Sequence, residues 1–200
     1  MRTGGDKTHR RLVQDALKLF TEQPYDKVTF NVLERGTKLS RGAILYHVDN
    51  KETLFREAAE LFVFYNNPLP EPAPEDSHPL LTTIKRFVEI KREEQDFWRE
   101  HGIPNINYAR IMMTISSFSL FPDSRENARQ LYRKEADIWK LAIEQAIERG
   151  EIRPTDPQLT AELFLSTYIG TAQSGMMESE GYNVDTLHDL LMKIYSLLAV

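Results

Sequence analysis

The sequence predicts an all-α protein of about nine helices. Apolar residues recur every three or four positions along most of the chain, which is the spacing of one face of a helix. The ten prolines and nine glycines fall mostly between these periodic segments. The alternation of β-branched residues that marks a half-buried strand is nearly absent. With 200 residues, 41% of them hydrophobic, the chain can form one or two domains with a buried core.

The composition excludes several kinds of site. The chain has no cysteine, so it forms no disulfide, no thiolate metal site and no cysteine nucleophile. Its first residues, MRTGGDKTHRR, lack the apolar core of a signal peptide. No segment approaches the roughly 18 consecutive apolar residues of a membrane span. We therefore expect a soluble, cytoplasmic protein with no membrane partner.

Charge is distributed unevenly along the chain. Residues 1–51 hold ten Lys and Arg against six Asp and Glu, a net charge of +4. The whole chain carries −5, which leaves −9 for the remainder. A basic N-terminal part on an acidic remainder fits a protein that contacts phosphates at one end, although it also fits an ordinary solvated surface.

Four helices are expected before residue 66. The first runs from about Thr8 to Gln23. Thr29 is placed to cap a short second helix and Ser40 a short third one, because a hydroxyl at this position accepts a hydrogen bond from a free backbone N–H. Asp49 or Asn50 would cap a longer fourth helix.

A proline-rich loop then divides the chain. Residues 66–79, NNPLPEPAPEDSHP, contain five prolines and cannot continue a helix. A long helix should follow it and stop near Gly102. Pro104 would lie in the first turn of the next helix.

Three more helices complete the chain. The first runs from about Pro122 to Arg149, with Gly150 just past its end. Asp156 and Pro157 indicate the cap and first turn of the second. The last contains the apolar residues Leu187, Leu190, Leu191, Ile194, Leu197 and Leu198.

The second and third helices have the form of a helix-turn-helix. In that motif the second helix offers the side chains of its N-terminal end to the major groove of DNA. Arg41 can reach phosphates or base edges, and Gly42 would let the backbone approach the duplex closely. A lysine at the start of the fourth helix would favour a phosphate. The candidate DNA-binding residues are Thr29, Ser40, Arg41, Gly42, Tyr46, His47 and Lys51.

Each candidate also has a purely structural interpretation. Thr29 and Ser40 can act as helix caps, with any DNA contact as an additional role. Tyr46 can be a core aromatic residue whose hydroxyl reaches water. His47 and Lys51 can be ordinary surface residues.

Residues from about Leu12 to Phe62 resemble the DNA-binding head of the tetracycline-repressor (TetR) family of bacterial regulators. The resemblance rests on ALKLF in the first helix, PYDKVT before the second, LSRG opening the third and VDNKETLF leading into the fourth. The later segment GEIRPTDPQLTAELF is similar to the turn and dimerisation helix of that family.

The resemblance implies a function and a division of the chain. Residues 1–49 would form the helix-turn-helix domain, and residues 50–200 a ligand-binding and dimerisation domain. The protein would be a transcriptional regulator, a repressor that a small apolar effector releases from a palindromic double-stranded operator. A homodimer would form through residues 157–175 and 184–199. The dimer interface would contain the apolar residues Leu163, Phe164, Leu187, Leu191, Ile194 and Leu198.

The implied effector cavity lies among the fourth to eighth helices. Aromatic residues and methionines there are by base rate core residues, but some should line the cavity. The candidates are Phe62, Tyr65, Phe87, Trp98, Tyr108, Met112, Phe118, Trp139 and Met176.

Three residues depart from the family pattern in the head. Lys38 stands where the turn usually has glycine, so a left-handed conformation there would cost about 1 kcal/mol; alternatively, Gly36 ends the helix early. Leu45 aligns with the usual tyrosine of the recognition helix, which leaves Tyr46 about 100° further around. Glu34 replaces a small residue.

Two other functions compete with this one. A di-iron enzyme would need two Glu-x-x-His motifs, and the nearest matches, Asp6-His9, Glu75-His78 and Asp185-His188, do not form a set. Residues 170–175, GTAQSG, lack the Lys-Ser/Thr of a phosphate loop and are better explained by close helix packing. We therefore expect no catalytic residue, metal or cofactor. The second alternative is a helical small-molecule sensor or interaction protein whose head has lost operator binding.

Overall fold

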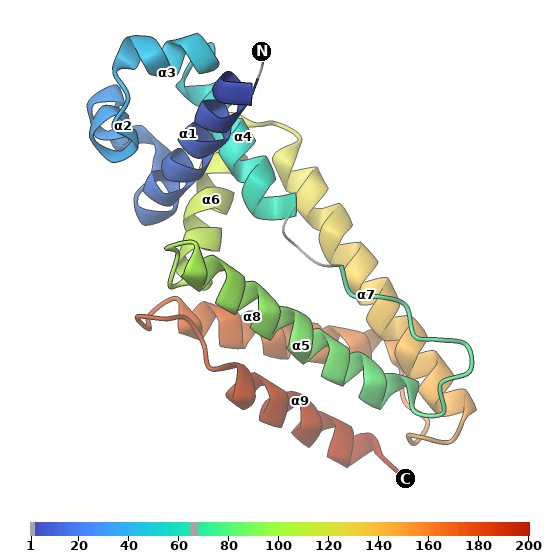
Figure 1. Cartoon of the computed structure of the whole chain (residues 1–200). Coiled ribbons are helices and arrows are strands. Elements are labelled where there is room, and N and C mark those ends of the chain that lie inside the picture. Colours follow the sequence, from blue (N-terminus) through green and yellow to red (C-terminus); the bar gives the residue numbers. More distant parts are fainter. Residues whose placement is uncertain (1–2, 65–67) are drawn as a thin grey trace. The chain divides into compact units, whose positions relative to one another are not determined.

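The computed structural model describes residues 3–64 and 68–200, and the fold is all-α as predicted (Figure 1). The described residues form nine α-helices and one short 3-10 turn. They are α1 (Thr3–Glu22), η1 (Tyr25–Lys27), α2 (Phe30–Thr37), α3 (Arg41–His47), α4 (Lys51–Phe64), α5 (Pro79–Glu100), α6 (Ile106–Leu120), α7 (Ser124–Glu148), α8 (Pro157–Gly175) and α9 (Val184–Leu198).

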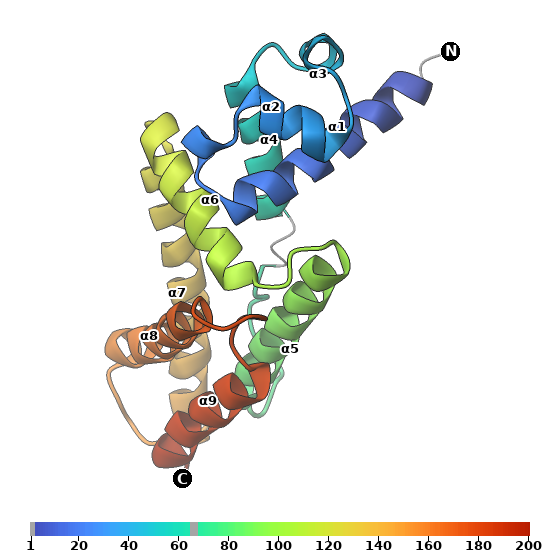
Figure 2. The ribbon, with the colours of Figure 1, turned by 90° about the vertical axis from the view of Figure 1, so that its left-hand side faces the viewer.

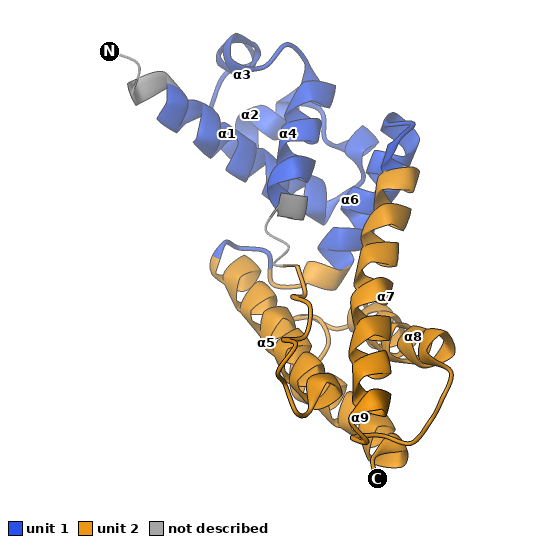
Figure 3. Cartoon of the chain, turned by 90° about the vertical axis from the view of Figure 1, so that its right-hand side faces the viewer, with its two compact units in different colours: residues 1–66, 101–103, 108–124 blue, residues 67–100, 104–107, 125–200 orange. Residues whose placement is uncertain are grey.

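The chain divides into two compact units (Figure 3). The head unit comprises residues 1–66, 101–103 and 108–124, and the body unit comprises residues 67–100, 104–107 and 125–200. Helix α6 therefore has its first two residues in the body unit and the rest in the head unit. The division at residues 49 and 50 expected from the resemblance concerns function, and it stays a prediction.

The core of the head unit forms where α1 packs on α2 and α4, and α2 packs on α3. Leu17 and Phe20 of α1 are buried with Leu33 of α2, Ile44 of α3 and Phe55 of α4. Helix α1 starts at Thr3, five residues earlier than the apolar pattern indicated. Asp6 in its first turn favours this extension because a negative charge there complements the helix dipole.

The predicted helix caps are confirmed. The Thr29 hydroxyl accepts a hydrogen bond from the Val32 N–H at 3.4 Å, and the Ser40 hydroxyl accepts one from the Ala43 N–H at 3.2 Å. Asn50, rather than Asp49, caps α4, because its side-chain oxygen accepts from the Thr53 N–H at 2.8 Å. In the body unit, the Asp156 carboxylate accepts from the Leu159 N–H at 3.0 Å and so caps α8.

Lys38 ends α2 in the left-handed conformation, with φ of 60°. Its N–H donates to the Glu34 carbonyl at 3.0 Å, as in a helix C-cap that usually contains glycine. Gly36 stays inside α2, so the alternative of an early helix end is wrong. The tight turn of the motif therefore forms without its usual glycine.

The core of the body unit is aromatic. Trp139 of α7 stacks on Phe164 of α8 with ring centroids 4.9 Å apart, and Phe87 of α5 meets Trp139 edge-on at 5.3 Å. Helix α9 runs beside α5 and α8 (Figures 1 and 2). The Glu151 carboxylate, just after α7, accepts the N–H groups of Leu80 and Leu81 at 3.1 and 2.9 Å and so caps α5.

The expected place of Pro104 in a helix is wrong. Helix α6 begins two residues later, at Ile106. Asn105 lies just before the helix, and its side-chain amide donates to the Gly175 carbonyl at the end of α8 at 3.0 Å. Among the residues that the structure describes, no helix is long and apolar enough to cross a membrane.

Candidate nucleic-acid interface

Helix α3 carries exposed polar residues above a buried apolar side. Ile44 and the following residue Val48 are buried and attach the helix to the head core. Ser40, Arg41 and Gly42 at its N-terminal end are exposed. This is the orientation that a recognition helix requires, with its apolar side on the domain and its N-terminal end open to a partner.

Glu34 and Phe30 of α2 support the N-terminal end of α3. The Glu34 carboxylate accepts the Arg41 N–H at 2.6 Å, which satisfies a donor that a helix start leaves free. The Arg41 guanidinium lies 4.6 Å from the centre of the Phe30 ring. A guanidinium stacked in this way keeps N–H groups at its edge for a phosphate or a guanine. The sequence identified Glu34 only as a departure and did not indicate Phe30.

Gly42 has open space around it. A Cβ at this position would meet no atom closer than the Ser40 hydroxyl oxygen at 4.0 Å. Nothing inside the protein therefore requires glycine here, although glycine weakens a helix. A partner that approaches the backbone from outside gives a reason for it.

Tyr46 projects into solvent and is 85% exposed, so its interpretation as a core residue is wrong. Its ring meets His47 edge-on at 5.2 Å, and His47 stacks on His9 of α1 at 6.0 Å. The Nε2 atom of His9 lies 2.8 Å from the Glu57 carboxylate of α4. The C-terminal end of α3 is thus linked through rings to His9 of α1, and His9 in turn contacts Glu57 of α4. His9 and Glu57 were not foreseen from the sequence as part of this surface.

Lys51 is not an ordinary solvated lysine. Its ammonium donates to the Tyr25 backbone carbonyl at 3.0 Å and lies 3.8 Å from the centre of the Tyr25 ring. Burial lowers the pKa of Lys51, and the charge of Asp26 partly opposes this shift. Burial also raises the pKa of Tyr25, followed by the charges of Glu52 and Asp26. Thr29 is exposed as the cap of α2.

The predicted effector-cavity residues fall into both units. Phe62, Tyr108, Met112 and Phe118 belong to the head unit, while Phe87, Trp98, Trp139 and Met176 belong to the body unit. Tyr65 lies outside the described residues. The structure brings Phe87 and Trp139 into direct contact in the body core. Their role in binding an effector stays a prediction.

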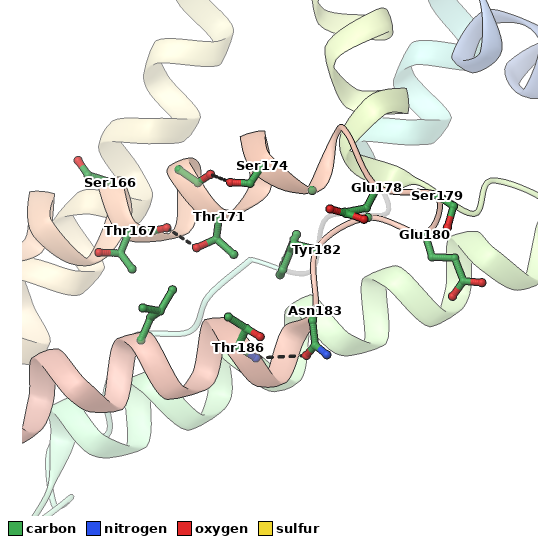
Figure 4. A pocket seen from close by; sticks show the side chains of 14 residues that line it. Ser166, Thr167, Thr171, Ser174, Glu178, Ser179, Glu180, Tyr182, Asn183 and Thr186 are labelled. Carbon is green, nitrogen blue, oxygen red and sulfur yellow. Dashed lines mark hydrogen bonds between the residues drawn. The ribbon is translucent and has the colours of Figure 1, made fainter.

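A groove of about 730 Å³ lies along α8, α9 and the loop that joins them (Figure 4). Its α8 side consists of small residues and hydroxyls, and none of the nine predicted cavity residues lines it. The Thr171 hydroxyl donates to the Thr167 carbonyl, and the Ser174 hydroxyl to the Gly170 carbonyl. These hydroxyls donate within α8, so the α8 wall of the groove consists of short side chains whose donors are already satisfied. No sequence pattern indicated the groove, because it forms only when α8 and α9 pack together.

The segment at residues 170–175 has two different glycines. A Cβ at Gly175 would lie 2.3 Å from the Tyr182 backbone nitrogen, so this glycine permits close packing against the loop rather than against a helix. A Cβ at Gly170 would have no atom within 4 Å. No group of three His, Asp or Glu side chains suited to a metal occurs in the described parts of the chain.

Comparison with known proteins covers both units. Residues 12–58 match the family model of bacterial regulatory proteins, tetR family. The chain is 26% identical over 158 residues to the uncharacterized HTH-type transcriptional regulator YhgD of Bacillus subtilis, and the match covers 79% of this chain and 78% of the relative.

Two solved structures share the fold. PfmR, a TetR family transcriptional regulator from Thermus thermophilus, superposes with a TM-score of 0.67 at 20% identity over 93% of this chain and 97% of its own. AibR, solved in complex with isovaleryl coenzyme A and operator DNA, has a TM-score of 0.59 at 15% identity, with 96% of this chain and 98% of its own covered.

The fold and the exposed recognition helix define a helix-turn-helix DNA-binding transcriptional regulator. Residues 12–58 match the DNA-binding head of the TetR family of bacterial regulatory proteins. The B. subtilis relative is likewise an HTH-type transcriptional regulator, and the whole chain shares the fold of a TetR family regulator.

Proposed function

We propose that the protein is a homodimeric repressor that binds a palindromic operator through α3 and the start of α4, and that a small effector bound in the body unit releases it. The observation that carries the DNA-binding part is the surface from Ser40 to Lys51. It combines a guanidinium, a glycine with open space and a fixed ammonium on one helix-turn-helix. Such a surface offers both phosphate contacts and base contacts.

The roles of the head residues differ. Arg41 stands at the N-terminal end of α3, where a side chain reaches base edges in the major groove. Lys51 and the N-terminal end of α4 favour a phosphate. The hydroxyls of Thr29 and Ser40 can donate to phosphate oxygens while they accept from the helix backbone. Tyr46 and His47 would contact the backbone of the same half-site.

Exposed leucines on α8 and α9 support the homodimer. Phe164, Leu187 and Leu191, expected on the dimer surface, are instead buried in the body core, because α9 packs on both α5 and α8. Leu163 is exposed as expected, together with apolar residues of the same two helices that were not expected there. The exposed residues are Leu159 (64% exposed), Leu163 (50%), Ile169 (45%), Leu190 (43%) and Leu197 (65%).

The groove between α8 and α9 gives these leucines a complementary surface. Its α8 wall of Ser166, Gly170 and Ser174 lets another helix approach closely, because these side chains are short. In a two-fold dimer each copy presents the same surface and receives the same surface. Both α8 and α9 of each copy would then form a four-helix interface.

An apolar effector fits the composition of the body unit. Phe87, Trp139, Phe164 and Tyr168 form an aromatic cluster, and the buried Lys91 ammonium lies 5.0 and 4.8 Å from the Phe87 and Tyr168 rings. AibR was solved with both a coenzyme A ester and DNA, which supports the same type of regulation here. The effector would lower operator affinity by favouring a head spacing that does not match two major-groove faces about 34 to 36 Å apart.

The test is selection of genomic DNA fragments by the purified protein, followed by sequencing of the retained fragments. We expect an inverted repeat whose half-sites are separated by one helical turn. The matched control is the Arg41→Ala/Lys51→Ala variant, which should retain its helical circular dichroism signal but select no motif. Equal, non-selective retention by both proteins would favour the alternative of a sensor without operator binding. Retention should then be repeated with pools of small molecules to find the effector.

A further inference from the structure

Tyr25 holds Lys51 by two different contacts. The turn η1 places its carbonyl oxygen 3.0 Å from the Lys51 ammonium and its ring centre 3.8 Å from the same nitrogen. The carbonyl and the ring thus take two of the three N–H directions of the ammonium. One N–H remains for a partner outside the protein.

Fixing this ammonium matters because a lysine side chain is flexible. A lysine side chain that moves freely in solvent loses rotamer entropy when a partner orders it. If the protein has already ordered Lys51, a phosphate that binds it does not bear that cost. A residue that fixes Lys51 therefore strengthens the contact without touching DNA.

Tyr25 is itself fixed by neighbours from several elements. Its ring stacks on Phe20 of α1 at 6.0 Å and meets Phe55 of α4 edge-on at 5.3 Å. Its N–H donates a long hydrogen bond of 3.4 Å to the Ser116 hydroxyl of α6. Phe55 also stacks at 6.0 Å on Phe121, which directly follows α6. Helix α6 therefore contacts Tyr25 both directly and through Phe55.

We propose that Tyr25 is a positioning residue for the operator contact of Lys51, and that it makes this contact depend on α6. The proposal rests on the proposed function, because it requires Lys51 to bind a phosphate. Tyr25 does not touch DNA in this role. It orders the ammonium, and Ser116 and Phe121 order Tyr25.

The start of α6 is also held in place, by contacts inside the body unit. The first residues of α6 belong to the body unit, where the Asn107 side chain accepts the Tyr182 N–H at 3.4 Å from the loop between α8 and α9. A Cβ at Gly181 would lie 2.7 Å from the same Asn107 oxygen, so this loop packs tightly on the start of α6.

A double-mutant cycle on operator DNA tests the positioning role. The variants are Tyr25→Leu, Lys51→Met and the double variant, with Tyr25→Phe as the conservative control that keeps the ring. We expect Tyr25→Leu to weaken operator binding about 3- to 10-fold, the effect of one partly exposed cation–π contact and a less ordered lysine. Tyr25→Phe should bind within about 2-fold of the wild type, since the ring and the carbonyl both remain. In the Lys51→Met background, Tyr25→Leu should have no further effect.

The cycle distinguishes the phosphate contact of Lys51 from the positioning role of Tyr25. If Lys51→Met leaves operator affinity and its salt dependence unchanged, Lys51 binds no phosphate and that part of the proposed function is wrong. If Lys51→Met weakens binding but Tyr25→Leu has the same effect with and without Lys51, Tyr25 acts only on the fold and the inference is overturned.

If Tyr25→Leu fails to fold, an NMR measurement on the wild-type protein tests the same contact. In the wild type, the NMR signals of the Lys51 ε-methylene protons should be shifted upfield by the Tyr25 ring below them. The shift should persist when operator is added, because the ring contact is kept in the complex. Signals at the position of an exposed lysine, in the free protein or in the complex, would overturn the inference.

The link to α6 is tested by Ser116→Ala, with Ser119→Ala as the matched control. Both serines lie on α6, but the Ser119 hydroxyl donates to the Ser116 carbonyl within the helix, whereas the Ser116 hydroxyl accepts from Tyr25. We expect Ser116→Ala to weaken operator binding about 2- to 3-fold, the value of one weak hydrogen bond, and only when Lys51 is present. Equal affinities of the two variants would overturn the dependence on α6.

Discussion

The two units expose different kinds of surface, although both are built from amphipathic helices. The head unit exposes α3 with a guanidinium, hydroxyls and the Tyr46 ring. The body unit exposes a row of leucines along α8 and α9 beside a groove of small residues. A charged, rigid partner such as DNA suits the first surface, and a second apolar surface suits the second. The two units therefore expose surfaces that suit partners of different kinds.

Charge separates the two surfaces further. Residues 1–51 carry +4 and the rest of the chain −9. The acidic part is repelled by phosphates, so non-specific attraction to DNA acts on the N-terminal part alone. The N-terminal 51 residues and the rest of the chain thus differ in the sign of their net charge and in their attraction to DNA.

The largest effect is expected from a charge on the apolar surface of the body unit. Leu163→Glu should convert a dimer of about twice 23.2 kDa into a monomer of 23.2 kDa, because two-fold symmetry places two carboxylates in one apolar interface. Operator affinity should fall by at least about 100-fold, since each half-site would bind one head alone. Light scattering and gel shifts measure the two effects.

Leu131→Glu is the matched control for this prediction. Leu131 of α7 is 50% exposed, the same fraction as Leu163, but it lies on a helix outside the proposed interface. Its variant should remain a dimer. If both variants dissociate, or if the wild type is itself a monomer, the exposed apolar residues of α8 and α9 do not form the proposed dimer interface.

A smaller effect is expected at the head surface, where Arg41 and Lys51 should behave differently. Arg41→Ala should cost about 1 to 3 kcal/mol on the operator and relax the base preference at one position of each half-site. Lys51→Ala should weaken binding to all sequences alike and reduce the slope of log K against log salt by about 1 per subunit. Binding measured on operator variants at several salt concentrations separates the two. Should Arg41→Ala match Lys51→Ala in every respect, Arg41 contacts phosphate only.

Gly42→Ala should separate stability from function in the head. The substitution adds a methyl group where there is open space, so it should raise the free energy of unfolding by about 0.5 kcal/mol through helix propensity. Operator affinity should nevertheless fall, because the methyl group would stand between α3 and the duplex. Thermal unfolding and gel shifts measure the rise in stability and the fall in operator affinity; an unchanged operator affinity would show that DNA does not approach α3 at Gly42.

Gly170→Ala tests the body unit in the same way, with dimer affinity in place of operator affinity. An unchanged dimer affinity would show that no partner helix approaches α8 at Gly170.

The smallest effect concerns pH and the body unit alone. Burial, and then the charge and hydrogen bond of Glu151, raise the pKa of Tyr195 from 10.0 to about 12. The unfolded tyrosine loses its proton near pH 10 and the folded one near pH 12, so this contribution to stability is complete below pH 10 and is lost as the pH rises to 12. The free energy of unfolding in urea should therefore fall over this pH range by more in the wild type than in Tyr195→Phe. Parallel curves would show that Tyr195 titrates normally.

The sequence predicted the local features well because their causes are local. The caps Thr29, Ser40 and Asp156 bond to residues three positions away, and a polar residue before an apolar run is enough to indicate them. The all-α fold follows from the same short-range periodicity. The left-handed conformation of Lys38 was one of two alternatives at the turn, and the hydrogen bond from its N–H to Glu34 decides between them.

The features that the sequence did not reveal depend on distant residues. Tyr25 and Lys51 are 26 positions apart, and Tyr25 and Ser116 are 91 apart, so no periodic pattern joins them. Leu187 and Leu191 resemble any other leucine of α9 until α5 is known to cover them. The residues of the candidate head surface could be named from the sequence, but the contacts that orient them could not.

The shared helix α6 also sets the order in which the protein can be completed during synthesis. The head unit takes residues from two separate parts of the chain, and Ser116 is made 91 residues after Tyr25. At about 5 to 20 residues per second, a ribosome needs roughly 5 to 20 s to cover that distance. During this interval α1 to α4 emerge without the contacts of Ser116 and Phe121, and the faces of Tyr25 and Phe55 that α6 will cover stay open to water. The part of the chain that leaves the ribosome first is therefore among the last to reach its final form.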